Sequence, residues 1–155
     1  MRGLRNTFYA SATAVLMALL ISLGTLHARS VEPTIAELKA RVSSTELRDR
    51  PKLCVQIAER QLQETDRLYT ASDDQKGVVA LDDVVTYSEL ARDYAIQSHK
   101  YQKQAEIAVR GMTRKISDIM HTLPQAEQVP LQKALSRLQR VRDDLLSAMF
   151  SKGNK

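Results

Sequence analysis

Two histidines and two methionines are the side chains of this sequence best suited to hold a metal ion: His99, Met112, Met120 and His121. Imidazole and thioether groups are soft ligands that favour copper. However, His99 and His121 are 22 residues apart on one predicted helix, and a straight helix would separate them by about 30 Å. The sequence also lacks the Cys-x-x-Cys-His motif of covalent haem attachment. We therefore expect no metal site and no cofactor.

Catalytic motifs are missing from the sequence, and its single cysteine offers little chemistry. There is no nucleophile elbow, no phosphate-binding glycine loop and no His-Glu-x-x-His pair. Cys54 lies among the apolar residues Leu53, Val55 and Ile57, so we expect a buried free thiol. The alternative is a disulfide between two copies, because one cysteine cannot form an internal disulfide. The sequence therefore predicts a protein that is not an enzyme.

Charged residues are segregated along the chain. Residues 73 to 93 are mainly acidic, whereas residues 100 to 115 and the last predicted helix are rich in Lys and Arg. In a helical hairpin the two basic sets would share one end, which could contact an anionic surface such as lipid or polysaccharide. The alternative is a solvated face whose charges suit the helix dipole. The candidate contact residues are Lys100, Lys103, Arg110, Arg114, Lys115, Arg137 and Arg140.

Three tyrosines, Tyr87, Tyr94 and Tyr101, are spaced at seven-residue intervals and would share one face of a helix. Such a strip could bind a sugar chain, a peptide or another helix. They share the phase of Val84 and Ala91, however, which favours rings buried between helices with hydroxyls that reach polar neighbours. Both readings make the tyrosines candidate interaction residues.

The elements that would position these residues are all helical, and we expect four helices at about residues 34 to 48, 51 to 72, 78 to 123 and 129 to 150. Thr34 and Glu37 form a capping box that opens the first helix. Pro51 and Pro130 suit the first turns of the second and fourth helices. The polar residues 73 to 77 predict a turn that ends the second helix, and Pro124 ends the third.

The third predicted helix is the longest and carries a seven-residue repeat. Its apolar and small residues recur at steps of three and four from Val84 to Met112, and it contains Gly111 but no proline. This pattern predicts an all-α bundle, elongated or compact and antiparallel, with one long central helix. A bend near residues 97 to 103 would give the compact form, but no helix breaker lies there, so we favour the elongated one. Half-covered helices would then expose apolar surface and favour a homodimer.

The first residues have the three-part pattern of a secretory signal peptide. Arg2 and Arg5 precede an uncharged segment at residues 6 to 26, and small and polar residues lead to Ala28. We expect a signal peptide at residues 1 to 28, a helical domain at 29 to 150 and a disordered tail at 151 to 155. The alternative is an uncleaved membrane anchor at residues 6 to 26. Loss of Arg2 and Arg5 lowers the formal net charge from +5 to +3.

Two short segments resemble known helical families. Residues 58 to 91 resemble one tetratricopeptide-type hairpin through Leu62, Tyr69 and Ala80, which implies a helical hairpin but no repeat array, because no second copy is present. Separately, residues 123 to 128 (LPQAEQ), placed before an amphipathic helix, are similar to the Leu-Thr-x-x-Gln turns of small periplasmic stress chaperones of the Spy/CpxP kind. That resemblance implies an exported, helical and often dimeric protein.

These patterns predict an exported helical scaffold or adaptor, periplasmic or secreted, that acts by contact with another protein or with itself. One alternative is a periplasmic stress chaperone of the Spy/CpxP type. Another is an envelope-surface binding protein that uses its basic residues. Export and the lack of a recognition motif argue against nucleic acid as a partner. Membrane contact is expected only through the N-terminal segment, if that segment stays uncleaved.

Overall fold

The computed structural model describes residues 32 to 151, and 82% of these residues are helical with no strand among them. The helices are α2 (Ile35–Arg41), α3 (Arg50–Thr70), α4 (Asp74–Ser98), α5 (Gln102–His121) and α6 (Val129–Phe150), with a short 3₁₀ helix, η1 (Gln125–Glu127), before α6. The prediction of an all-α fold is confirmed, with five α-helices packed against each other. The predicted signal peptide at residues 1 to 28 and nearly all of the predicted tail lie outside the described residues.

Helix α2 begins at the predicted capping box but ends sooner than predicted. Glu37 N donates to Thr34 Oγ1 at 3.2 Å, and Thr34 N donates to Glu37 Oε2 at 2.7 Å. The helix stops at Arg41 instead of residue 48. The Arg50 guanidinium then donates to the carbonyls of Ser43 and Thr45, at 3.0 and 2.9 Å. These bonds satisfy the backbone of a non-helical segment between α2 and α3.

The prediction of one long central helix is wrong, because the chain turns back at residues 99 to 101 and divides that segment into α4 and α5. His99 and Tyr101 adopt left-handed backbone angles, with φ of 55° and 66°. Because the chain reverses, α5 buries Ala105, Val109 and Met112 against helices of the same chain. A straight helix would leave these side chains exposed unless another chain covered them. The four helices predicted from sequence therefore become five.

A second difference concerns the polar residues 73 to 77, which were expected to form a turn. Residues Asp74 to Gly77 form the first turn of α4, and only the three residues before them, 71 to 73, belong to the connection with α3. The α4 helix therefore starts four residues before the position expected from its apolar stripe. Gly77 is buried, and this is where the ring of Tyr69 packs against the helix.

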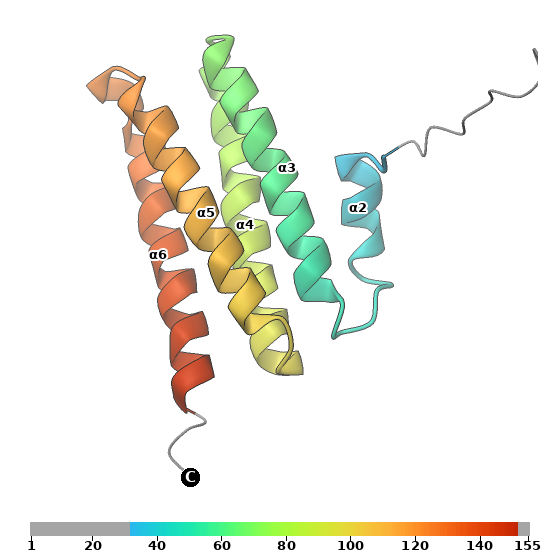
Figure 1. Cartoon of the computed structure of the whole chain (residues 1–155). Helices are drawn as coiled ribbons and strands as arrows, with labels where there is room; N and C mark the ends of the chain where they lie inside the picture. The colour runs from blue at the N-terminus through green and yellow to red at the C-terminus, as the bar shows by residue number, and fades with distance from the viewer. Residues whose placement is uncertain (1–31, 152–155) are drawn as a thin grey trace, which may run out of the picture. The chain divides into compact units, whose positions relative to one another are not determined.

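The helices from α3 to α6 lie side by side in Figure 1, with α2 beside α3. Helix α3 packs on α4, and α5 packs on α6. In each pair a short connection reverses the direction of the chain. Between these two hairpins, α4 contacts α6 and α3 contacts α5. Ion pairs from residue 82 to 137 and from 92 to 144 fix α4 and α6 in the same direction.

The core is built from the predicted apolar stripes. Every helix from α3 to α6 contributes fully buried aliphatic side chains, with α3, α4, α5 and α6 represented by Ile57, Val84, Ile116 and Leu138. Small residues of the seven-residue repeat, Ala91 and Ala105 among them, are also fully buried. The repeat that was expected to line one long helix therefore lines the inner faces of α4 and α5.

Candidate interaction surfaces

The predicted aromatic strip does not form an open surface. Tyr87 and Tyr94 of α4 are partly buried and packed against the core. Lys39 Nζ lies 5.3 Å from the centre of the Tyr87 ring, and the Arg50 guanidinium lies 5.3 Å from that of Tyr94. Both rings are therefore covered by cations from the chain around α2. Tyr101 lies in the α4–α5 connection, so the three tyrosines do not share one helix face.

The predicted basic residues are spread along α5 and α6 instead of gathering at one end. Arg142 Nε and Nη2 of α6 both donate to Glu106 Oε1 of α5 at 3.1 Å, so this pair joins the two helices. Lys103, Arg110 and Arg114 are exposed, and their spacing of seven and four residues places them on one face of α5. Lys100 and Arg140 are also exposed, in the α4–α5 connection and on α6.

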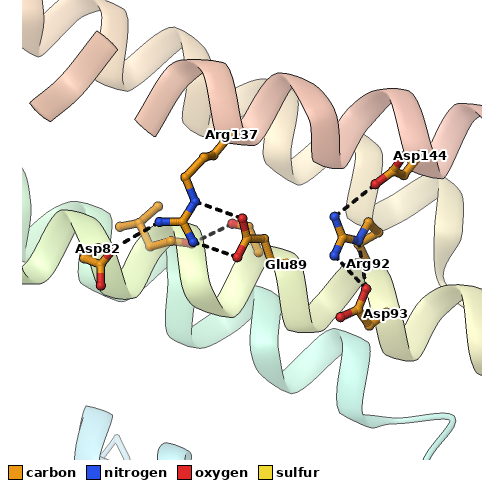
Figure 2. Close-up of polar contacts among 8 residues, drawn as sticks. Asp82, Glu89, Arg92, Asp93, Arg137 and Asp144 are labelled. Carbon is orange, nitrogen blue, oxygen red and sulfur yellow. Dashed lines mark hydrogen bonds and ion pairs between the residues drawn. The ribbon is translucent and has the colours of Figure 1, made fainter. Parts of the chain in front are cut away.

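Besides Arg110, which lies 3.6 Å from Glu106 on its own helix, two of the predicted contact residues form ion pairs between helices. Lys115 Nζ of α5 lies 2.8 Å from Asp66 Oδ2 of α3, at a partly exposed position. Arg137 of α6 donates to both carboxylate oxygens of Glu89, at 3.0 and 2.7 Å, and to Asp82 at 3.1 Å (Figure 2). The hydrogen bond with Glu89 is the main cause that raises the pKa of Arg137 above its ordinary value. Arg137 therefore joins α6 to α4.

A second arginine crosses the same interface in the opposite direction. Arg92 of α4 lies 3.0 Å from Asp144 of α6 and 2.8 Å from its neighbour Asp93 (Figure 2). The acidic and basic segments recognised in the sequence thus meet across the α4–α6 interface. The bidentate Arg137–Glu89 pair and the single Arg92–Asp144 contact fix the register of α4 and α6 more than they add stability, because both pairs are partly exposed.

Glu106 is a charged residue of the interior that the sequence did not single out. Its side chain is 9% exposed and accepts hydrogen bonds from Arg142, while Arg110 lies 3.6 Å from its second oxygen. The sequence signal was its position next to Ala105 on the inner face of the predicted helix. Buried carboxylates need such partners because desolvation of an unpaired charge is unfavourable.

An apolar groove lies between the first halves of α4 and α6, with a volume of about 560 Å³. Val79 and Val129 in its wall are 67% and 63% exposed, and Val78 is 38% exposed. Asp82 and Asp83 line the α4 side, and Lys133 lines the α6 side. The sequence analysis missed this groove. The available signal was a set of β-branched residues at two helix starts, outside the apolar stripes.

A second groove, of about 540 Å³, lies between α3 and α5. Ile107 in its wall is 47% exposed, and a Cβ atom built at Gly111 would meet no atom within 4 Å. Asp66 and Lys115, which form the ion pair between the two helices, also line this groove. Gly111 is exposed, so this position of α5 has room for a side chain.

Cys54 lies in the core, as its apolar neighbours in the sequence predicted. It is fully buried in α3 and forms no disulfide. Burial raises its pKa to about 11, with a small opposing effect from Arg50. A thiol with this pKa is a poor nucleophile at neutral pH because little thiolate is present. Its position is that of a small core residue.

The described residues contain few features of other kinds of site. Between residues 32 and 151 no group of three His, Cys, Asp or Glu side chains lies close enough together to hold a metal ion. Within the same range no helix is both long and apolar enough to cross a membrane. No protein-family model, no curated protein and no solved structure matches this chain. The surfaces described above are therefore the basis for a functional proposal.

Proposed function

We propose that this chain is an exported helical adaptor or scaffold that binds an amphipathic helix of another protein in the α4–α6 groove. The observation that carries the proposal is the continuous apolar surface made by Val78, Val79 and Val129 at two neighbouring helix starts. An exposed apolar patch rimmed by polar residues is typical of a protein-binding site. Export is inferred from the pattern of residues 1 to 28.

The charges around the groove favour one kind of occupant. Asp82 retains 70% exposure of its side chain although it binds Arg137, and Lys133 on the opposite wall is exposed. A partner helix with an apolar stripe, basic residues on one flank and acidic residues on the other would fit both walls. This is the helix-in-groove mode, in which residues at i, i+3 or i+4, and i+7 anchor the partner.

Site-specific photo-crosslinking in the producing cells tests this proposal. A photoreactive side chain at position 79 or 129 should give the same discrete adduct, whose mapped peptide has an apolar stripe with the flanking charges described above. Matched control positions are Gln104 and Gln139, which are exposed on α5 and α6. The adduct at position 129 should disappear when Val79→Lys is added. Equal adducts at all four positions, or none at positions 79 and 129, would refute a groove-specific adaptor.

The exposed basic face of α5 supports a second candidate, an envelope-surface binding function. Lys103, Arg110 and Arg114 share that face, and only Arg110 among them has a carboxylate nearby, at 3.6 Å in Glu106. Sedimentation with vesicles containing anionic lipid should then show binding that falls as salt rises. Arg114→Glu should remove it, and Arg48→Glu, an exposed change on the α2–α3 segment, should not. Lack of sedimentation at low salt would exclude this candidate.

The chaperone alternative has a separate readout. A chaperone of the Spy/CpxP type would suppress the aggregation of a denaturing client, as measured by light scattering, and a dedicated adaptor would leave the scattering unchanged. Suppression that is lost in Val79→Lys would replace the adaptor by a chaperone that uses the same groove. Suppression that persists in this variant would place client binding on another surface.

A further inference from the structure

The connection between α4 and α5 is short and conformationally unfavourable. It consists of His99, Lys100 and Tyr101, and the first and last of these have φ values of 55° and 66°. The left-handed region is disfavoured for any residue with a Cβ atom, and glycine is the usual solution. Residues 97 to 103 contain neither glycine nor proline. The sequence therefore does not encode a turn at the place where the chain reverses.

Hydrogen bonding does little to hold this turn. His99 N donates to the carbonyl of Ile96 at 3.3 Å, and Lys100 N donates to Ser98 Oγ at 3.3 Å. In the described part of the chain, neither Lys100 N nor Tyr101 N donates to a backbone carbonyl. The amide hydrogen bonds of a continuous helix would satisfy these groups. Locally, a straight helix is thus the better conformation.

The apolar repeat continues through the turn without a change of register. Ala91, Tyr94, Ser98, Tyr101 and Ala105 are spaced by three, four, three and four residues. In a straight helix they would all lie on one face. In the monomer, the packing of the α5–α6 hairpin against α3 and α4 keeps the turn between α4 and α5 in place. This packing does not require the hairpin to come from the same chain.

We propose that two copies of this chain exchange their α5–α6 hairpins. In each copy the residues 99 to 101 straighten, so that α4 and α5 form one helix from Asp74 to His121, about 70 Å long. The α5–α6 hairpin of each copy then packs on α3 and α4 of the other. The Arg137–Glu89, Arg92–Asp144 and Lys115–Asp66 ion pairs form between copies.

The exchange loses no interhelical contact, because the same helix faces pack together in the monomer and in the exchanged dimer. The monomer and the exchanged dimer differ in the connection and in the entropy of association. A short hinge under strain shifts this balance toward exchange as the protein concentration rises. The inference goes beyond the proposed adaptor function and does not depend on it. Each α4–α6 groove would be composed of two copies, so that the dimer would carry two grooves.

A charge-reversal experiment distinguishes exchange from every other dimer. Arg137→Glu alone places like charges at Glu89, and Glu89→Arg alone places like charges at Arg137. When the two variants are unfolded and refolded together, an exchanged heterodimer contains the original pair in one interface and the reversed pair in the other. A heterodimer should therefore exceed either homodimer by about tenfold or more, as measured by native mass spectrometry in reducing buffer. Refolding without a heterodimer overturns the proposal.

Glycine variants keep the test valid if the charged variants do not fold. His99→Gly relieves the left-handed residue in the turn and weakens the straight helix, so both effects favour the monomer. The association constant for dimerisation, measured by sedimentation, should fall by about tenfold or more. Ser72→Gly is the matched control, because Ser72 also has a positive φ, 57°, but lies in the α3–α4 connection. A wild-type protein that stays monomeric at millimolar concentration, or equal effects of the two variants, overturns the proposal.

Discussion

The two connections that flank α4 reverse the chain in different ways. At the α3–α4 connection Ser72 is left-handed, Ser72 N donates to the carbonyl of Tyr69 at 3.1 Å, and Asp73 N donates to that of Leu68 at 2.9 Å. These are the two hydrogen bonds of a Schellman motif. The α4–α5 connection has two left-handed residues, and among its three amides only that of His99 donates to a backbone carbonyl of the described residues, at 3.3 Å. The first turn is stable by itself, whereas the second depends on packing elsewhere.

Packing around the two connections differs as well. Near the first, the Tyr69 ring would lie 3.1 to 3.3 Å from a Cβ atom at Gly77, so α3 and α4 approach as closely as a glycine permits. On α5, beyond the second, a Cβ atom at Gly111 would meet nothing within 4 Å. At Gly77 the α3–α4 pair is therefore a closely fitted unit, whereas the exposed position Gly111 on α5 has room for a side chain.

The largest effect concerns the thiol of Cys54, which lies in the closely fitted unit. Burial holds its pKa near 11, two units above the ordinary 9.0, so at pH 8 labelling by a maleimide should be more than about 100-fold slower than in the urea-unfolded protein. Because only the neutral thiol suits the folded state, the contribution of Cys54 to stability should be constant below about pH 9 and should be lost as the pH rises toward 11. Rapid native labelling at pH 8 would contradict a closed α3–α4 unit.

The next effect concerns the close contact between Tyr69 and Gly77. Gly77→Val should destabilise the protein by about 2 to 3 kcal/mol, because the ring of Tyr69 is buried and the added side chain must displace it. Urea unfolding followed by circular dichroism measures this change. Val79→Gly, two residues away and exposed, is a control that lowers stability only by the glycine penalty of about 1 kcal/mol. Equal losses would mean that the contact is not tight.

The same contrast explains which features the sequence could predict. The capping box at Thr34 and the prolines at helix starts act over a few residues, and the helix starts that they indicated are present. The break at His99 could not be predicted, because it arises from tertiary packing that overrides a local preference for helix. For the same reason the ion pairs of Arg137 could not be predicted from the sequence. Its sequence neighbours give no sign that α4 and α6 lie side by side in the same direction.

The surface features of the molecule also differ in how far the sequence could predict them. Charge segregation in the sequence correctly separated acidic α4 from basic α6, but its interpretation as a free basic end missed that these charges neutralise each other. The exposed valines of the α4–α6 groove lie at helix starts, where a one-dimensional pattern cannot distinguish an inner face from an outer one. Only the position of α6 next to α4 makes Val79 and Val129 one surface.

A smaller effect is expected at Gly111, an exposed position of α5. Gly111→Ala should stabilise the protein by about 1 kcal/mol, because alanine is the better helix former and the site has room for its methyl group. The opposite sign is expected for Gly77→Ala, since its Cβ atom would lie 3.1 Å from the Tyr69 ring. Thermal unfolding of both variants measures the difference. A loss of stability in Gly111→Ala would show that α3 and α5 pack more closely than we describe.

The smallest effect compares the two turns directly through the stability of the monomer. Ser72→Gly and His99→Gly each remove a side chain from a left-handed residue, and each should stabilise the monomer by about 0.5 to 1 kcal/mol at low micromolar concentration. Their kinetic effects should differ. The Ser72 turn can form within a local segment, so Ser72→Gly should accelerate folding. The His99 turn closes only as α5–α6 docks, so His99→Gly should mainly slow unfolding. Stopped-flow fluorescence of the tyrosines measures both rates, and identical changes would mean that the two turns form at the same stage.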